Sequence, residues 1–381
     1  MTSIYAAAFF CATLILLNLV SIGIAMVRTR LKMRPAPTPA PAPGVSLVRP
    51  VCGLDNFCEE TLGSSFSLDY PLYEIIFCVA RGSDPAAPLV RRLIAAHPQV
   101  PARLIVGDEK VSANPKLNNC VRGWDAAKHD YIVLADSNVM MPKDYIQRLL
   151  AGFGPTTGLV CSMPLGSRPQ NLWAELECAF LNTFEARWQY AAAGVAGGFA
   201  QGKNMMWRRQ VLEAGGGIRA LAAEIAEDAA STKLVRAQGL TVDLVDRPFE
   251  QPLGRRSLSD VWMRQLRWAR MRRKTFPLHY APEIFAGAAL PCLVAAYGAH
   301  ALDAGAPGIL GAAVLMVLLW HIPEMVLART AGWHFSWRMP LMLILRDLML
   351  PIMYVDAWFV DNFTWRGNEM SVREEPTAHG G

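Results

Sequence analysis

The feature that most constrains this chain is an apolar segment near its start, residues 4 to 27, "IYAAAFFCATLILLNLVSIGIAMV". Crossing the hydrocarbon core of a bilayer takes about 20 apolar residues, so this segment is long enough to span a membrane. A cleaved signal peptide carries its positive charge ahead of a shorter apolar core, whereas here the basic run "RTRLKMR" follows. The segment therefore predicts an N-terminal transmembrane helix, and the positive-inside rule places residue 28 onward in the cytosol.

Apolar segments return towards the end of the chain, at about residues 284 to 302, 308 to 328 and 339 to 360. Each is long enough to span a bilayer, and membrane helices tolerate prolines and glycines when neighbouring helices satisfy the backbone. The last segment contains Arg346 and Asp347, which are costly at bilayer depth, so it either spans, is re-entrant or lies in the interface. With 52% hydrophobic residues, the chain is predicted to be a multi-pass membrane protein with about three C-terminal membrane helices.

The part between these segments alternates strand-like and helix-like runs, which favours a parallel sheet built from βαβ units. Two runs, "DPAAPLVRRLIAAHP" and "NPKLNNCVRGWDAAKH", have apolar residues at helical spacing. The fold class is therefore α/β. The predicted strands are residues 45 to 51, 73 to 80, 102 to 108, 130 to 136 and 158 to 164.

The predicted organisation follows from these segments. An N-terminal transmembrane helix (1–27) leads into a basic, proline-rich linker (28–44), where "RPAPTPAPAPG" favours stiff polyproline II. A cytosolic catalytic domain (45–280) ends in an amphipathic interface helix. C-terminal membrane helices (281–365) and a polar tail (366–381) complete the chain.

The cysteine spacing argues against a zinc site, and the charge argues against a nucleic-acid-binding protein. The eight cysteines form no CxxC pair and have no histidines at zinc-ligand spacing, so we interpret them as reduced thiols. The net charge of +5 is modest, and much of the basic excess lies beside predicted membrane segments, where anionic lipid attracts it. The bilayer is therefore a predicted partner and nucleic acid is not. The sequence does not indicate an oligomeric state.

The run "YIVLADSNV" reads as a buried strand that ends at Asp136, with Asn138 two positions on. In an open parallel sheet, ligands bind beyond the carboxyl ends of the strands. An Asp-x-Asn pair at such a point could hold a divalent cation that bridges a diphosphate, because hard oxygen ligands suit Mg²⁺ or Mn²⁺. The alternative is a turn aspartate that caps the next helix.

Two further candidate site residues, Asp84 and Lys116, lie where a predicted loop leads into a helix. In "CVARGSDPAAP", Asp84 precedes a helix with Pro85 in its first turn; N-capping explains it, and a hydrogen bond from a nucleobase imide is the functional alternative. In "NPKLNN", Lys116 lies at a helix start, where free backbone N–H groups and a cation suit a phosphate. A solvated surface lysine is the alternative.

The run "AAEIAEDAASTKLVRAQGL" places Glu227 and Asp228 at the start of a helix that ends at Gly239. Acidic residues in a first turn are favoured by the helix dipole. A general base works best when its pKa is raised towards the operating pH, which burial and an adjacent like charge would do. These two effects oppose each other, and the sequence does not rank them.

Residues 261 to 276, "VWMRQLRWARMRRKTF", predict an amphipathic helix. Arg264, Arg267, Met271 and Lys274 share one face, while Trp262, Leu266 and Ala269 share another. One interpretation is a membrane-surface helix with its arginines on anionic lipid. The other adds that Arg267 clamps a leaving diphosphate, because a guanidinium matches phosphate oxygens bidentately.

Taken together, Asp84, Asp136, Asp228 and "RQLRW" (264–268) resemble the ordered "D, D, D, (Q/R)xxRW" signature of family 2 type glycosyltransferases with a GT-A fold. The chain is more closely similar to the ceramide glucosyltransferases of family 21, of the bacterial type. This resemblance runs from about residue 45 to 367. The motifs that carry it are "VSLVRPVCGLD", "FSLDYPLYEIIFCVARGSDPA", "ANPKLNN", "LADSN", "IAEDAA" and "TWRGN".

The resemblance implies a GT-A domain, Rossmann-like with a mostly parallel sheet, and inverting transfer of glucose from UDP-glucose to the primary hydroxyl of ceramide. It implies that Asp84 contacts the uracil, that Asp136 engages the diphosphate through a metal, and that Asp228 deprotonates the acceptor. The diphosphate and acceptor site would be lined by Arg264, Gln265, Arg267 and Trp268. In a bacterium the membrane would be the inner one.

Two departures from the family pattern matter. Asn138 stands in place of the final acid of a DxD, so one metal ligand is neutral. "GGFAQGKNMMWRR" (197–209) occupies a region where the family varies, and Lys203 there either touches the diphosphate or lies in a loop.

The alternatives differ in acceptor or in class. A transferase could instead glycosylate a hopanoid, a sterol or diacylglycerol, or use UDP-GlcNAc or another UDP-sugar. A polysaccharide synthase generally needs more spans for its channel than the four candidates here. From a different class, the chain could be a membrane protein that binds nucleotide sugars without catalysis.

Overall fold

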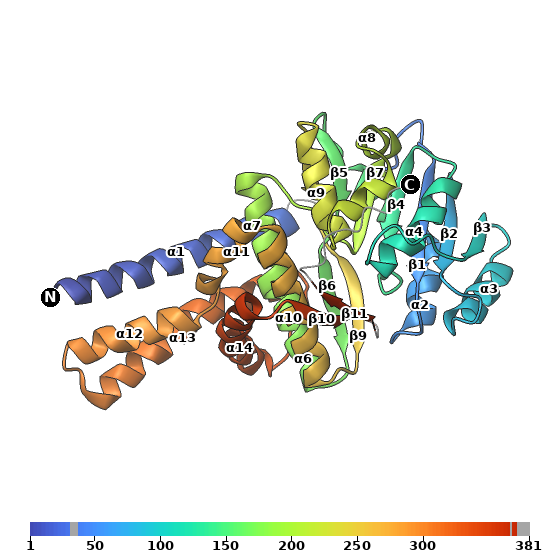
Figure 1. The fold of residues 1–381 in the computed structure, drawn as a ribbon. Helices are drawn as coiled ribbons and strands as arrows, with labels where there is room; N and C mark the ends of the chain where they lie inside the picture. The colour runs from blue at the N-terminus through green and yellow to red at the C-terminus, as the bar shows by residue number, and fades with distance from the viewer. Residues whose placement is uncertain (31–36, 366–367, 372–381) are drawn as a thin grey trace. The chain divides into compact units, whose positions relative to one another are not determined.

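The computed structural model describes residues 1–30, 37–365 and 368–371 (Figure 1). The rest of the chain, which includes residues 31–36 of the predicted linker and most of the predicted tail, lies outside the described residues. Within the described residues, contacts divide the chain into two compact units. The helical unit consists of residues 1–30, 169–191 and 255–371, and the sheet unit of residues 37–168 and 192–254. The boundaries of the five predicted domains stay predictions.

The sheet unit is built on a seven-stranded sheet with the order β3-β2-β1-β4-β7-β5-β8. Its strands are β1 (Val45–Val51), β2 (Tyr73–Val79), β3 (Ala102–Val106), β4 (Tyr131–Ala135), β5 (Thr157–Cys161), β7 (Asn204–Arg208) and β8 (Thr241–Leu244). The five predicted strands are confirmed to within three residues at each end. Strand β7 runs antiparallel to both of its neighbours, and the other pairs are parallel. The mostly parallel α/β architecture is therefore confirmed.

Helices cover both faces of this sheet. On one face, a single core cluster joins alternate residues of β1 and β2 to α2 (Cys58–Gly63), α3 (Ala86–Ala96) and α5 (Tyr145–Leu150). Successive side chains of a strand point to opposite faces of its sheet. Helix α4 (Pro115–Ala126) lies on the other face, because it approaches the residues of β1 and β2 that alternate with those of the core cluster. A Cβ at Gly123 of α4 would lie 2.6 Å from both Val48 and Cys78, so this close approach of helix to sheet requires glycine.

The remaining elements of the sheet unit lie between and after these strands. They are the 3₁₀ turns η1 (Ser64–Ser67) and η3 (Ile218–Ala223), the helices α8 (Arg209–Ala214) and α9 (Glu227–Ala237), and the separate two-stranded sheet of β6 (Pro164–Pro169) and β9 (Phe249–Gly254). Helix α9 stops at Ala237, and Gly239 follows with φ of 71°, the left-handed conformation that ends many helices. The predicted helix of residues 227 to 239 is confirmed.

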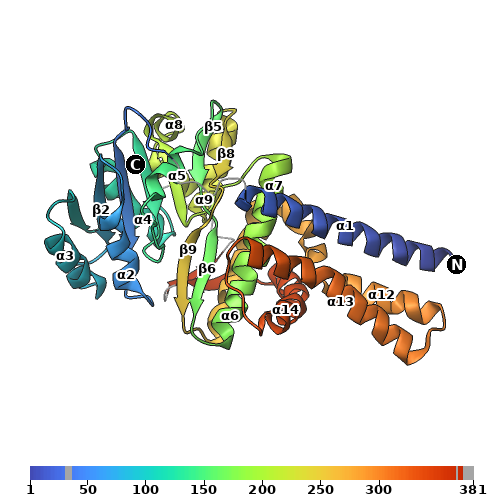
Figure 2. The ribbon, with the colours of Figure 1, turned by 180° about the vertical axis from the view of Figure 1, so that it is seen from behind.

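The helical unit collects three distant parts of the chain. It holds α1 (Thr2–Arg30), α6 (Leu172–Cys178), the π-helix η2 (Ala179–Ala186), the start of α7 (Arg187–Ala196), α10 (Leu258–Thr275), α11 (Pro277–Tyr280), η4 (Ala281–Phe285), α12 (Ala289–Ala301), α13 (Gly305–Thr330), α14 (Met339–Phe359) and the hairpin of β10 (Asn362–Trp365) and β11 (Asn368–Ser371). In Figures 1 and 2, α1 lies alongside α12 and α13.

Two helices of the described residues, α1 and α13, are long and apolar enough to cross a membrane. The pair formed by residues 277–285 and α12 bends by 44° and gives a third candidate if it counts as one span. This is fewer than the four spans predicted. The segment predicted at about 284 to 302 is broken before α12, which has 13 residues. Helix α14 carries three acidic or basic residues, Arg346, Asp347 and Asp356.

The costly charges of α14 are paired inside the helical unit. Arg346 contacts Asp347 at 2.7 Å and Glu324 of α13 at 2.8 Å. Arg187 of α7 lies 3.3 Å from the same Glu324, and His321 lies 3.0 Å from Asp347. Because Arg187, Glu324 and Arg346 have no exposed side-chain surface, this network ties α7, α13 and α14 together in the interior.

Candidate active site

A cluster of charged side chains lies at the carboxyl end of β4. Asp136 follows directly after this strand, and its two carboxylate oxygens accept from two different lysines: Oδ1 from Lys116 at 2.7 Å and Oδ2 from Lys203 at 2.8 Å. Lys203 also donates to Asn138 Oδ1 at 3.2 Å. The structure thus brings together three of the predicted site residues, Lys116, Asp136 and Asn138.

Lys116 is held at the start of α4. The Asn114 side chain caps this helix by accepting from the backbone N–H groups of Lys116 and Leu117. The Lys116 ammonium then donates to Asp136, to Glu227 Oε1 at 2.6 Å and to the carbonyl of Gly202. Because an ammonium group has three protons, these three acceptors use its full hydrogen-bonding capacity.

Lys203 reaches the cluster through the antiparallel strand β7. Its carbonyl accepts from the backbone N–H of Asp136 at 3.0 Å, and the next residue, Asn204, pairs with Ala135 at the end of β4. This register places Lys203 beside Asp136. The sequence left its role open because β7 was not among the predicted strands.

Asp228, the predicted general base, lies in the first turn of α9 beside the same cluster. Its Oδ2 accepts from the backbone N–H of Gly202 at 3.0 Å, and its Oδ1 from the N–H of Ala229 at 2.8 Å. A Cβ on Gly202 would lie 2.8 Å from Glu227 Oε1 and 3.2 Å from Lys116 Nζ, so this contact between loop and helix leaves no room for a side chain.

The cluster shifts the pKa values of its acids in opposite directions. Burial, and then the adjacent Glu227 carboxylate, raise the pKa of Asp228 to about 6. Burial would also raise the pKa of Asp136, but Lys116 and Lys203 outweigh it and hold this pKa well below its ordinary value. One carboxylate is therefore suited to accept a proton near neutral pH, and the other stays ionised.

Arg49 of β1 is a positioning residue that the sequence reasoning missed. Its buried guanidinium donates to the backbone carbonyls of Asp136, Ser137 and Val139 at 2.9 to 3.1 Å. On its other side it donates to the carbonyl of Thr61 at 2.7 Å. It thereby fixes the loop that carries Asp136 and Asn138. The available signal was a single charged residue inside a mostly apolar predicted strand.

Asp84 makes its observed hydrogen bonds with backbone N–H groups rather than with the lysines. Its carboxylate accepts from Gly53 with both oxygens at 3.1 Å and from Ala86 at 2.8 Å. Pro85 is the N-cap residue of α3, and Asp84 precedes it and accepts from the N–H of Ala86, the first residue of the helix. Gly53 has φ of 67° in the turn after β1. A carboxylate offers about four acceptor positions, so these contacts leave a role towards a nucleobase untested.

The predicted amphipathic helix is α10, which begins with a capping box between Ser257 and Asp260. It belongs to the helical unit. Arg264 pairs with Glu177 of α6, whose carboxylate also lies 3.2 Å from Arg256. Gln265 is buried, while Arg267 and Trp268 are half-buried.

Three further arginines of α10 also have carboxylate partners. Arg270 lies 2.6 Å from Asp356, Arg272 lies 2.9 Å from Glu283, and Arg273 pairs with Asp361. Much of the positive charge that suggested a lipid-binding face is therefore paired with carboxylates of the helical unit.

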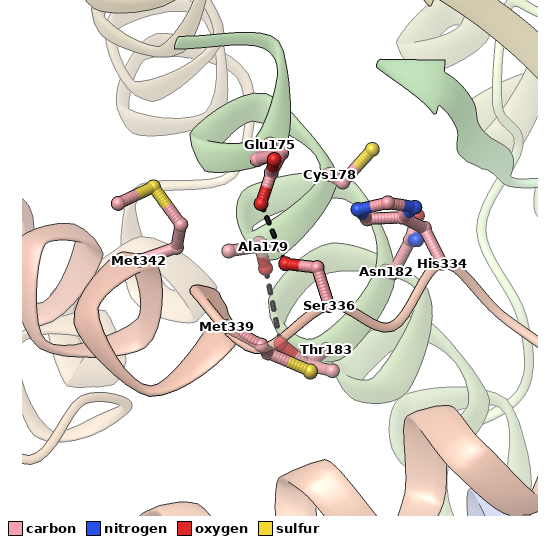
Figure 3. A pocket seen from close by; sticks show the side chains of 9 residues that line it. All are labelled: Glu175, Cys178, Ala179, Asn182, Thr183, His334, Ser336, Met339 and Met342. Atoms are coloured by element: carbon pink, nitrogen blue, oxygen red, sulfur yellow. Dashed lines mark hydrogen bonds between the residues drawn. The ribbon is translucent and has the colours of Figure 1, made fainter. Parts of the chain in front are cut away.

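Two pockets of the helical unit lie beside the π-helix η2. Gln265 lines one of them with aromatic residues that include Phe180, Phe184 and Tyr280. Figure 3 shows the other, in which Glu175 accepts from Ser336 at 2.6 Å. This second pocket is lined by Glu175, Cys178, Ala179, Asn182, Thr183, His334, Ser336, Met339 and Met342, none of them a predicted site residue.

The predicted metal ligands do not fit a resident cation as they are arranged. Both oxygens of Asp136 accept from ammonium groups, and the Asn138 oxygen accepts from Lys203. Across the described residues, three or more His, Cys, Asp and Glu side chains are nowhere grouped so that they could hold a metal ion.

The comparison with known families covers nearly the whole chain. Residues 13–378 match the profile of Glycosyl transferase family 21. The chain belongs to this family. The family 21 chain has curated relatives named ceramide glucosyltransferases. Ceramide glucosyltransferase 1 of Caenorhabditis elegans is 23% identical over 335 residues, which cover 86% of this chain and 72% of that protein. The ceramide glucosyltransferase of Komagataella phaffii is 28% identical over 60% of this chain and 57% of its own.

Solved structures are more distant. The mannosyltransferase PcManGT of Pyrobaculum calidifontis, in complex with GDP-Man and Mn²⁺, is 18% identical to this family 21 chain. The match covers 90% of this chain and 99% of that one, with a TM-score of 0.49.

Family membership confirms the predicted class of enzyme and, with the observed sheet, the predicted fold class. The protein is a glycosyltransferase with a mostly parallel α/β domain of the GT-A type. Helices α1 and α13 are candidate membrane spans, one N-terminal and one towards the C-terminus, and the protein is a membrane glycosyltransferase.

Proposed function

We propose that this family 21 glycosyltransferase transfers glucose from UDP-glucose to the primary hydroxyl of ceramide with inversion, giving β-glucosylceramide. The observation that carries the proposal is the Asp228 carboxylate, whose pKa is raised to about 6, beside the lysine-paired Asp136 at the carboxyl end of the sheet. The names of the relatives support glucose as the sugar and ceramide as the acceptor.

In this reaction, Asp228 takes the proton of the acceptor hydroxyl as the hydroxyl oxygen attacks the anomeric carbon of glucose. The bond from that carbon to the diphosphate oxygen breaks, and its electron pair leaves with UDP. A single in-line displacement inverts the anomeric centre without a covalent enzyme intermediate. A base with a pKa near 6 is deprotonated in most molecules at neutral pH and still accepts a proton in the transition state.

The other predicted site residues keep the roles that the family resemblance implies. Asp84 accepts a hydrogen bond from the uracil imide, and Asp136 with Lys116 lies on the diphosphate side of the donor. Arg264, Gln265, Arg267 and Trp268 of α10 bind the diphosphate and the acceptor. The contacts of Arg264 with Glu177 and of Asp84 with Gly53 orient these side chains before substrate arrives.

The two substrates set the cellular position of the site. UDP-glucose is dissolved in the cytosol and ceramide is confined to a leaflet, so the reaction belongs at the cytosolic face of the membrane. The basic residues in the last turn of α1, Arg28 and Arg30, support a cytosolic position for the chain after this helix. In a bacterium, the membrane would be the inner one, crossed more than once.

A divalent cation, Mg²⁺ or Mn²⁺, also stays a prediction for this chain. Solved neighbours hold Mn²⁺ with GDP-Man or with UDP, which is a property of those proteins. No step of the transfer above requires a cation at Asp136 and Asn138.

The test is release of UDP by the purified full chain in detergent or lipid. With UDP-glucose and ceramide, we expect UDP and a lipid one hexose heavier, in equal amounts, by coupled assay and mass spectrometry. A parallel panel with a sterol, a hopanoid and diacylglycerol, and with UDP-GlcNAc, measures specificity. If another lipid gave product and ceramide did not, that lipid would replace ceramide as the proposed acceptor. Binding of UDP-glucose without UDP release on any lipid would reject transfer altogether.

A further inference from the structure

The strongest unassigned feature is that two lysine ammonium groups contact the Asp136 carboxylate. A DxD metal site offers two carboxylates to a cation, whereas this chain has one carboxylate, a neutral Asn138 and two ammonium groups in contact with them. The chain therefore already supplies positive charge at the point where such a metal would sit.

The two lysines have different surroundings. Lys116, with 11% of its side chain exposed, divides its three protons among Asp136, Glu227 and the Gly202 carbonyl. Its charge is shared by two carboxylates, which hold its pKa above the ordinary value although burial alone would lower it. Lys116 thus joins the end of β4, the start of α9 and the loop before β7.

Lys203 is held by Asp136 and Asn138, which belong to one loop. Asp136 fixes it twice, because its carboxylate accepts from the ammonium and its backbone N–H donates to the Lys203 carbonyl at 3.0 Å. An ammonium group is a compact point charge suited to phosphate oxygens, and that of Lys203 lies beside Asp136 at the carboxyl end of β4, the edge at which ligands of such sheets bind.

We propose that Lys203 supplies the positive charge that binds and neutralises the diphosphate of the nucleotide donor in place of a DxD metal ion. Asp136 and Asn138 hold the ammonium group, and Lys116 is a positioning residue for Asp136. As the bond to the sugar breaks, negative charge grows on the diphosphate, and the adjacent ammonium stabilises it without a proton changing hands. This inference rests on the proposed function in taking a nucleoside diphosphate sugar as donor.

The test measures UDP binding by isothermal titration calorimetry on the full chain in detergent, once with EDTA and once with Mg²⁺. The variants are Lys203→Met, which removes the charge, and Lys203→Arg, which keeps it. The matched control is Lys233→Met on α9, an exposed lysine of the same unit that pairs with Glu224 at 2.5 Å. Thermal unfolding of each variant reports folding.

We expect the parent chain to bind UDP in EDTA with an affinity that Mg²⁺ changes by less than about threefold. Loss of one charge-assisted hydrogen bond weakens binding by about tenfold, so Lys203→Met should lose about that much in both buffers. Lys203→Arg should restore most of this loss, and Lys233→Met should bind as the parent does.

Several results would overturn the inference. These are UDP binding that requires Mg²⁺, binding by Lys203→Met at the parent affinity, or no UDP binding in either buffer. UDP binding that depends on Lys203 without Mg²⁺, in a protein that transfers no sugar to lipid, would uphold the inference and reject the proposed function.

Discussion

Two groups of ion pairs, one in each unit, differ in how deeply they are buried. In the helical unit, Arg187, Glu324 and Arg346 have no exposed side-chain surface and pair only within the interior. In the sheet unit, Lys203 and Asp136 form an equally close pair but keep 14% and 21% of their side chains exposed. A buried pair is costly to break and therefore structural, whereas a partly exposed pair can exchange a partner for a charged substrate. The buried pairs of the helical unit thus serve stability, and the partly exposed pair of the sheet unit is suited to chemistry.

The largest expected effect is a fall in the rate of transfer when Asp228 of the sheet unit is replaced. Asp228→Asn keeps the size of the side chain and one oxygen that can accept from Gly202 or Ala229, but its amide cannot take the proton of the acceptor hydroxyl. General-base catalysis contributes about 10²- to 10⁴-fold, so kcat should fall by about that factor while UDP binding stays measurable. The measurement is transfer to ceramide by mass spectrometry, with calorimetric UDP binding as the control. Turnover near that of the parent would remove Asp228 as the base.

The converse change in the helical unit should affect stability first. Arg346→Met leaves Glu324 and Asp347 buried with less compensation, and breaking a buried ion pair costs about 3 to 5 kcal/mol. We expect a marked drop in the thermal unfolding temperature in detergent. Arg338→Met, which breaks a half-exposed pair with Glu175, is the control and should cost about 1 kcal/mol or less. Equal effects of the two substitutions would erase the distinction between buried and exposed pairs.

Arg267 of α10 tests whether the arginine helix serves chemistry or structure. Arg267→Lys keeps the charge but loses the planar fork that binds two phosphate oxygens, so we expect kcat/KM for UDP-glucose to fall by about tenfold or more. Lys274→Arg, an exposed position on the same helix, is the matched control. An unchanged rate would assign Arg267 to contact with the membrane surface instead of the diphosphate.

The last prediction concerns the pH dependence of the rate. Burial and Glu227 raise the pKa of Asp228 to about 6, so its protonated, inactive form persists to higher pH than for an ordinary aspartate. The rate should therefore rise with pH through about 6 and level off above it, with about a tenfold loss per pH unit below. The measurement is kcat/KM for ceramide from pH 4.5 to about 8. A profile that is flat from pH 5 upward would contradict the assignment.

The sequence predicted the elements that have a local signal. Strands β1 to β5 appear as short apolar runs because parallel strands are covered on both faces, and Asp136 and Asp228 follow recognisable strand and helix boundaries. The position of Lys203 depends on the pairing of β4 with β7, which no local pattern encodes. The same holds for the contacts of Arg49 with Asp136 and of Glu177 with Arg264, each of which joins residues 87 positions apart in the chain.

The described residues contain fewer candidate membrane spans than the sequence predicted, for a related reason. Composition alone does not show that residues 284 to 302 bend before α12, or that Arg346 and Asp347 find partners in α13. The pairing of α10 arginines with Asp356, Glu283 and Asp361 was equally hidden, because an arginine-rich face looks the same whether lipid or carboxylates cover it.

The most direct test of the whole account is the anomeric configuration of the product. The full chain is incubated with UDP-glucose and ceramide, and the glycolipid is examined by proton NMR. A single displacement assisted by Asp228 gives the β-anomer alone. An α-linked product, or hydrolysis of UDP-glucose without glycolipid, would contradict the displacement mechanism and the role of the Asp228 carboxylate in it.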